Sequence, residues 1–307
     1  MPQTGLPESP LVAIVRRLRE PTLPVLTVAH RGDSQNAPEN TLAAFALAVE
    51  HGAELVEFDV HETADGDVVV LHDETVDRTT DGRGEVHRLP TAAVRELSAG
   101  AWFGARWKDE RVPLLDEALD LCRAGRVAPM VEIKVKWRRR LPIGRKVGEA
   151  LRRHGLSDKA VVIVRGFDRV PEVKAAAPET PVVTLTFTKR QARTAMRSEG
   201  VSGVDCYWKS LSSGLVAELR QGGFFMTPWT VNRARDIERL ILIGSESVVT
   251  DAPVLSRDRI ERFELERTLE HMERVARGEP PPLDLEQDDD APGPTPDELA
   301  ADPDAPS

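Results

Sequence analysis

Two short stretches of the sequence place acidic side chains inside the pattern of a buried strand. In LVEFDV, Glu57 and Asp59 alternate with apolar residues, and in MVEIKVK, Glu132 and Lys134 do the same. Because successive side chains of a strand point to opposite faces, the charged residues of each stretch share one face. Converging carboxylates repel each other unless a cation lies among them. We therefore expect either neutralisation by arginines or a site for one divalent cation, Mg²⁺ or Ca²⁺, whose preferred ligands are oxygens.

Two other apolar runs end in basic side chains. These side chains suit acid–base chemistry on a phosphate. His30 and Arg31 follow one run, and His72 follows another. A single histidine in such a place is more often a hydrogen-bonded structural residue, but two of them beside carboxylates have the composition of a general acid and base. Arg31 supplies a two-pronged guanidinium and Lys134 a point charge, both of which bind phosphate. These residues predict an active site for phosphate chemistry.

Other residues of chemical interest have a structural alternative. Trp229 stands between a strand and a helix, where it serves equally as the wall of a pocket or as a core side chain. Asp251 precedes Ala-Pro, and we expect it to cap the last helix. Pro38 and Glu39 are expected to begin the helix after the first strand, whose positive end favours an anion. The remaining histidines are expected to face solvent, and they are His51, His61, His87, His154 and His271.

Nine β-branched runs predict the strands that carry these side chains. They are Val25–Ala29, Glu54–Val60, Val68–His72, Pro129–Lys134, Ala160–Val164, Pro181–Phe187, Gly203–Asp205, Gly223–Pro228 and Ser247–Thr250. Helical periodicity separates most of them, which favours an α/β fold of the (β/α)8 TIM barrel type. Because nine strands exceed the eight of such a barrel, we expect one pair to be a hairpin or an elaboration. A doubly wound open sheet is the alternative, but its G-x-G-x-x-G motif is missing and the polar clusters follow many strand ends.

The net charge of −10 is concentrated at the C-terminus. Residues 278–307 hold ten acids, eight prolines and no lysine or arginine, while the rest of the chain has 41 acids and 41 bases. Such a composition predicts a disordered, acidic, proline-rich tail. We expect an N-terminal extension at 1–24 and a barrel domain at 25–277. A loop-and-helix insertion after the third strand segment is expected at about 80–118.

The bulk composition excludes several classes of function. A formally neutral body gives no reason to expect nucleic-acid binding. No stretch approaches the roughly 20 apolar residues of a membrane span, and the N-terminus lacks the pattern of a secretory signal. Cys122 and Cys206 have no metal or redox spacing, so a reduced cytoplasmic location is the simplest interpretation.

Several motifs occur in an order that resembles the glycerophosphodiester phosphodiesterases. They are AHRG, PENT, AFALAVEHGAELVEFDVHETADGDVVVLHDETVDRTTDGRG, VEIK, WTVN and TDAP, and they extend from about Val25 to Pro253. The resemblance implies a barrel that binds one divalent ion. It also implies roles for the matching residues: Glu57, Asp59 and Glu132 as metal ligands, His30 and His72 as catalytic histidines, Arg31 and Lys134 as phosphate ligands, Trp229 as a wall of the glycerol pocket, and Glu39 as a supporting residue.

The same resemblance implies a small-molecule substrate and a reaction. It implies metal-dependent hydrolysis of glycerophosphodiesters to glycerol 3-phosphate and an alcohol, through a cyclic phosphate formed by the substrate's own 2-hydroxyl. The chain departs from the family at Arg165-Gly166, where a Ser-Phe pair is typical, and this change concerns substrate preference more than catalysis. One alternative is a phospholipase acting on lysophospholipids through an apolar mouth at Trp102, Phe103 and Trp107. The other is a phosphate-binding relative without catalytic activity.

Overall fold

The computed structural model describes residues 9–134 and 142–277, and its strands form one nine-stranded sheet. Eight strands are neighbours in the order β8-β7-β6-β5-β4-β2-β1-β9, and each pair along this order is parallel. Their bounds are β1 (Leu26–Ala29), β2 (Leu55–Glu62), β4 (Ala128–Ile133), β5 (Val161–Val164), β6 (Val182–Thr186), β7 (Val201–Tyr207), β8 (Phe225–Trp229) and β9 (Ser247–Thr250).

The two end strands of this order, β8 and β9, lie side by side. The backbone N–H of Val231 donates to the carbonyl of Val249 at 2.9 Å, and the Ser247 hydroxyl donates to the carbonyl of Met226 at 2.8 Å. The sheet therefore curls round into a nearly closed barrel. The predicted TIM barrel is confirmed, and the open-sheet alternative is wrong.

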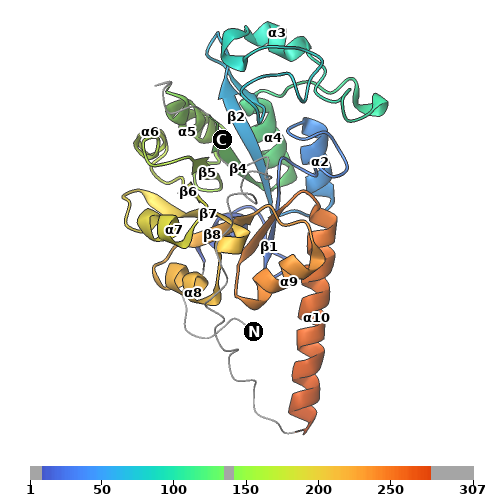
Figure 1. Cartoon of the computed structure of the whole chain (residues 1–307), viewed down its shortest axis with the longest axis vertical. Coiled ribbons are helices and arrows are strands. Elements are labelled where there is room, and N and C mark those ends of the chain that lie inside the picture. Colours follow the sequence, from blue (N-terminus) through green and yellow to red (C-terminus); the bar gives the residue numbers. More distant parts are fainter. Residues whose placement is uncertain (1–8, 135–141, 278–307) are drawn as a thin grey trace.

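A helix packs outside the barrel after each of these strands, as Figure 1 shows. The helices are α2 (Leu42–Glu50), α4 (Leu115–Gly125), α5 (Ile143–Arg153), α6 (Val170–Ala176), α7 (Lys189–Ala195), α8 (Ser213–Gln221), α9 (Ala234–Leu242) and α10 (Pro253–Arg277). None of the helices in the described ranges has the length and apolar composition that crossing a membrane requires.

The strands divide their side chains between the helices and the barrel interior. On β2, Val56 and Phe58 belong to the apolar cluster shared with the helices, whereas Leu55 belongs to the cluster inside the barrel. Because side chains alternate along a strand, Glu57 and Asp59 follow Leu55 to the inside. Burial on both faces explains why the strand sequences are nearly continuous apolar runs.

A short helix, α1 (Pro10–Arg16), closes the end of the barrel at which the strands begin. The hydroxyl of Ser9 caps it by accepting a hydrogen bond from the N–H of Leu11 at 3.2 Å. Its buried side chains Leu11, Ile14 and Val15 share an apolar cluster with Leu26, the first residue of β1. The residues before β1 therefore close the barrel at the N-terminal ends of its strands.

The ninth strand, β3 (Val68–Val70), pairs antiparallel with the end of β2, so the predicted hairpin is confirmed. It leads into η1 (Val86–Arg88), α3 (Thr91–Glu96) and η2 (Ala105–Trp107), which lie above the barrel in Figure 1. This segment has an apolar cluster of its own, formed by Val69, Leu71, Val76, Val86, Val94, Ala99 and Val112. It is a small packed unit at the end where the barrel strands finish.

Candidate active site

An open pocket lies inside the barrel toward the C-terminal ends of the strands. Enzymes with this fold place their active sites at that end. Five of the predicted site residues line it together with four residues that were not predicted. The lining residues are His30, Glu57, Glu132, Lys134, Trp229, Ile163, Leu185, Asp205 and Val249.

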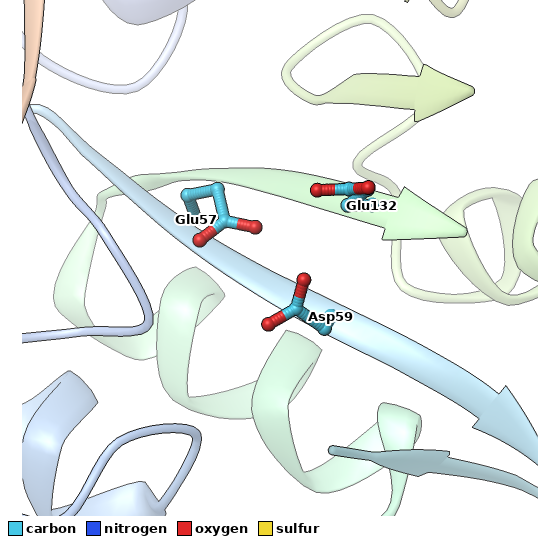
Figure 2. A group of neighbouring side chains, drawn as sticks. All are labelled: Glu57, Asp59 and Glu132. Atoms are coloured by element: carbon cyan, nitrogen blue, oxygen red, sulfur yellow. The ribbon is translucent and has the colours of Figure 1, made fainter. Parts of the chain in front are cut away.

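Three carboxylates converge beside this pocket, as Figure 2 shows. Glu57 and Asp59 come from β2 and Glu132 from β4, and one oxygen of each lies within 4.8 Å of the others. Asp59 and Glu132 are direct neighbours in the register of the two strands. Among the described residues, buried Glu57 Oε1 has no hydrogen-bond partner. An all-oxygen set with an unsatisfied buried atom fits a divalent cation such as Mg²⁺ or Ca²⁺.

The two carboxylates on β2 have opposite pKa shifts. Burial raises the pKa of Glu57 well above its usual value, and the charges of Asp59 and Glu132 raise it further. Burial would also raise the pKa of Asp59, but the charges of Lys134, His72 and Arg31 hold it below the usual range. Nearby cations therefore neutralise only part of the cluster, which leaves room for the charge of a metal ion.

His30 is held by Asp251, from the far end of the chain. The imidazole Nδ1 lies 2.7 Å from Asp251 Oδ1, whose carboxylate also accepts hydrogen bonds from the Ser34 hydroxyl at 3.1 Å and from the Asn232 amide at 2.5 Å. Burial would raise the pKa of Asp251, but the His30 bond and charge lower it. The expectation that Asp251 caps the last helix is wrong, because this carboxylate is engaged at the active site and α10 begins at Pro253.

His72 is held in the same way by its neighbour. Its Nδ1 lies 2.7 Å from Asp73 Oδ1, and its carbonyl lies 2.9 Å from Nε2 of His61. Burial lowers the pKa of His61, which lies on β2 with only 7% of its surface exposed. The expected solvent-facing position of His61 is therefore wrong, since β2 ends two residues later than predicted and includes it.

Arg78 in the insertion binds two carboxylates of the site. Its guanidinium donates to Asp73 at 2.8 and 3.0 Å and to Glu39 at 2.8 Å through each terminal nitrogen. Glu39 in turn accepts a hydrogen bond from Arg31 at 2.9 Å. The charges of both arginines lower the pKa of Glu39 against the opposing effect of burial. Arg78 thus joins the insertion to both the histidine and the arginine of the site.

The turn after β1 aims Arg31 at the carboxylates. Arg31 adopts a left-handed φ of 58°, its N–H donates to Glu57 at 2.9 Å, and its Nε lies 3.4 Å from Asp59 Oδ2. At Gly32, with φ 82°, a Cβ atom would lie 2.6 Å from the Ala44 backbone, so only glycine fits this close approach.

The helix after this turn starts later than expected. Thr41 caps α2 by accepting from the Ala44 N–H at 3.3 Å, so the predicted start near Pro38 is wrong. Asn40 precedes the cap with φ 58° and donates to Asp59 at 2.8 Å. Residues that precede the helix are thus used to position the carboxylate.

Lys134 and Trp229 complete the predicted set. Lys134 Nζ lies 3.0 Å from Glu132 and 3.3 Å from Asp59. Trp229 ends β8, lines the pocket and packs edge-on against Phe187 with ring centroids 5.4 Å apart. Both interpretations of Trp229 hold, because it is 4% exposed and also belongs to the interior apolar cluster.

The other histidines lie away from the pocket. His51 bonds Asp33 at 2.6 Å, and His154 bonds Asp116 and Asp120 at 2.9 and 3.1 Å. Only 13% of the His154 side chain is exposed, so the prediction that it faces solvent is wrong, whereas the His51 side chain is 29% exposed and meets solvent in part. His87, which is 25% exposed, lies 3.1 Å from Glu85. The side chain of His271 lies outside the described part of the chain.

Sequence reasoning overlooked several polar residues of the site, and Asp205 is one that lines the pocket. It is on β7 with 3% of its surface exposed, and the Thr227 hydroxyl donates to it at 2.6 Å. The signal was available, because Asp205 interrupts an apolar strand near its C-terminal end.

The sequence of this chain matches one protein family over most of its length. Residues 30–255 match the model of the glycerophosphoryl diester phosphodiesterase family. The chain is 36% identical over 230 residues to a glycerophosphodiester phosphodiesterase of Caldanaerobacter subterraneus, covering 74% of this chain and 94% of the relative. It is 32% identical over 253 residues to one from Bacillus subtilis, covering 75% and 85%.

Solved structures give the same result. A phosphodiesterase from Oleispira antarctica, solved with the product sn-glycerol-3-phosphate, matches with a TM-score of 0.71 at 27% identity, covering 78% of this chain and 97% of that one. A glycerophosphodiester phosphodiesterase from Agrobacterium tumefaciens matches with a TM-score of 0.67 at 28% identity, covering 76% and 98%.

Proposed function

Because this chain belongs to the glycerophosphoryl diester phosphodiesterase family, we propose that its barrel pocket hydrolyses glycerophosphodiesters to glycerol 3-phosphate and an alcohol. The chain is an enzyme of the phosphodiesterase class, acting on small molecules. One observation carries the proposal. His30 and His72 are each held by a carboxylate, and both lie at the same end of the barrel as the three-carboxylate cluster.

In this proposal Glu57, Asp59 and Glu132 hold one Mg²⁺ or Ca²⁺ ion. Their oxygens are the ligands that both ions prefer, and their close approach supports this assignment. When bound, the cation supplies positive charge that stabilises the negative charge of the phosphoryl oxygens in the transition state. Arg31 and Lys134 contribute further positive charge from the chain itself, and their contacts with Asp59 place that charge beside the cluster.

The two histidines carry the protons. One accepts the proton of the substrate's 2-hydroxyl as the hydroxyl oxygen bonds to phosphorus, and the other protonates the alcohol oxygen as its bond to phosphorus breaks. The product of this step is a cyclic phosphate. Water then adds to phosphorus and the ring bond to O2 breaks, with the two histidines in reversed roles, giving glycerol 3-phosphate. An attached nucleophile has a high effective concentration, which lowers the barrier by several kcal/mol.

Carboxylates fix the histidines for this task. Because Asp251 and Asp73 each contact a ring Nδ1, we assign the proton transfers of this proposal to the Nε2 atoms. The carboxylates also stabilise the charged imidazolium that forms during each step.

The wider organisation is part of the proposal. We place the catalytic barrel at 25–277 and the insertion at about 80–118, with 1–24 as an extension whose helix α1 closes one end of the barrel. The acidic segment 278–307 lies outside the described residues and is proposed to take no part in the chemistry. A cytoplasmic location is proposed from the cysteines, because Cys122 and Cys206 are buried free thiols.

A substrate screen tests the proposed activity. Glycerophosphocholine, glycerophosphoethanolamine, glycerophosphoinositol and a lysophospholipid are incubated with the enzyme, with and without chelator, and the released head-group alcohol is measured, because all four substrates yield it when the phosphodiester is hydrolysed. We expect release from the three water-soluble diesters and its loss with chelator. Release from the lysophospholipid alone would overturn the proposal in favour of a phospholipase.

A further inference from the structure

One buried acid in the pocket has no role in the mechanism above. Asp205 lies on β7, and its neighbours on the pocket wall are apolar, including Leu185 and Trp229. Burying a carboxyl group in such surroundings is costly unless it is hydrogen-bonded. The hydroxyl of Thr227, directly opposite in the strand register, donates to Asp205 Oδ1 at 2.6 Å.

Asp205 faces the carboxylate cluster from across the barrel. In the closed strand order, β7 is four places from β2 in either direction, so the two strands lie on opposite walls. Asp205 does not belong to the group formed by Glu57, Asp59 and Glu132, although the charge of Glu132 adds to burial in raising the pKa of Asp205. The space between the two walls is the pocket.

This arrangement gives the pocket two chemically different ends. The phosphate end carries His30, Glu57, Glu132 and Lys134. The opposite wall is apolar apart from Asp205 and the indole N–H of Trp229, and among the lining residues in the described ranges Asp205 is the one carboxyl on that wall. A few fixed polar groups on apolar walls are what determine the orientation and specificity of a small ligand.

Resting on the proposed function, we propose that Asp205 binds the terminal hydroxyl of the substrate's glycerol unit and thereby selects for an unsubstituted glycerol. The 2-hydroxyl must stay close to phosphorus and the histidines, so the terminal hydroxymethyl group points away from the phosphate end. A hydroxyl both donates and accepts hydrogen bonds, so it pairs with a carboxyl group in either protonation state. An acyl ester at this position could not donate such a bond, which disfavours 1-acyl lysophospholipids.

The inference is tested by comparing two substrates, with the wild-type enzyme and with a variant of Asp205. The substrates are glycerophosphocholine and 2-hydroxyethyl phosphocholine, which keeps the attacking hydroxyl but lacks the terminal hydroxymethyl group. A site built to bond a hydroxyl discriminates strongly against the analogue that lacks it. We expect wild-type kcat/KM to favour glycerophosphocholine by about 10- to 100-fold, from the typical cost of leaving a buried hydrogen-bonding group without its partner. Asp205→Ala should lower kcat/KM for glycerophosphocholine by a similar factor and leave the analogue nearly unchanged.

Control variants separate binding from folding. Glu246 is another buried carboxyl, which accepts from the Met226 N–H at 3.1 Å near the beginning of β9. Glu246→Gln should leave the substrate ratio unchanged. Asp205→Leu, which is similar in size to the native residue and cannot form a hydrogen bond, suits the apolar wall, should fold if Asp205→Ala does not, and should reduce the ratio.

The outcomes distinguish the inference from the proposed function. Equal wild-type rates on the two substrates, or equal losses on both in a folded Asp205 variant, overturn the inference alone. A wild-type enzyme that hydrolyses neither substrate overturns the proposed function and the inference together.

Discussion

Nδ1 of His30 lies 2.7 Å from Oδ1 of Asp251, although the two residues are 221 positions apart. His30 follows the first barrel strand and Asp251 follows the last, and these strands are parallel neighbours. Closure of the barrel therefore brings a carboxylate to the imidazole and fixes which nitrogen faces the pocket.

Removing the charge of Asp251 tests this relationship. We expect Asp251→Asn to lower kcat by about 10- to 100-fold with a smaller change in KM, because partners that orient a functional histidine typically contribute that much. Steady-state kinetics over a range of pH measure the effect, with Asp236→Asn on the outer helix α9 as the control. An unchanged pH profile and kcat would show that Asp251 has only a structural role.

Replacing either catalytic histidine should have a larger effect. His30→Ala and His72→Ala are each expected to lower kcat by about 10²-fold or more, the typical contribution of a general acid or base. His154→Ala is the matched control, because that ring bonds Asp116 and Asp120 on α4 outside the pocket. Near-normal turnover by a folded His30 or His72 variant would contradict the assigned roles.

Chelation should abolish turnover, and added Mg²⁺ or Ca²⁺ should restore it. Glu57, Asp59 and Glu132 hold more negative charge than their protein partners neutralise, so a cation is expected among them. Glu57→Gln should weaken calorimetric binding of the ion far more than it lowers the unfolding temperature. Full activity in excess chelator after dialysis is the result that excludes a metal.

The insertion should contribute to catalysis through Arg78. Arg78→Ala removes the guanidinium that holds Asp73 beside His72 and Glu39 beside Arg31. We expect kcat to fall by about 10-fold or more and its pH profile to shift, with partial rescue by Arg78→Lys. Arg83→Ala is the control, since that side chain is 91% exposed and lies 3.8 Å from Asp77. Equal effects of the two alanine variants would count against this role.

Asp73 should make the free energy of unfolding depend on pH in the acid range. Although burial opposes it, hydrogen bonds from His72 and Arg78 lower the pKa of Asp73 in the folded protein. Its contribution is therefore fully present above its unfolded pKa of about 3.9 and is lost as pH falls toward the folded value. Urea unfolding should be measured from pH 7 to 3 for wild type and Asp73→Asn. The difference between their free energies of unfolding should narrow below about pH 4. If this difference in the free energy of unfolding widened in acid, the pKa of Asp73 would be raised in the folded protein, which contradicts the prediction.

Local sequence patterns predicted the strands and the inward acids because both depend on the alternation of side chains. The nine predicted strands all occur, and the acids of LVEFDV point inward as the period of two requires. His61 shows the limit of this reasoning. The apolar run ends at Val60, but pairing with β3 extends β2 to Glu62. Hairpin pairing is a tertiary contact that a single-strand pattern does not contain.

The carboxylate partners of the histidines were missed for a related reason. Asp251 has the local signature of a helix cap, and its contact with His30 exists only because the first and last strands meet. Pro38 and Glu39 resemble a helix start, but Asn40 is used to hold Asp59 instead. At Asn40 and Asp251, contacts within the active site determine the position of the side chain, although the local sequence favours the start of a helix.

The position of α1 beneath the barrel has a kinetic consequence. Its side chains Leu11, Ile14 and Val15 fill the lower end, whereas the pocket lies toward the C-terminal ends of the strands. Within the described residues, substrate therefore reaches the pocket, and products leave it, from that upper end. Glycerol 3-phosphate that has not departed therefore blocks the next turnover, and its inhibition is competitive with the diester.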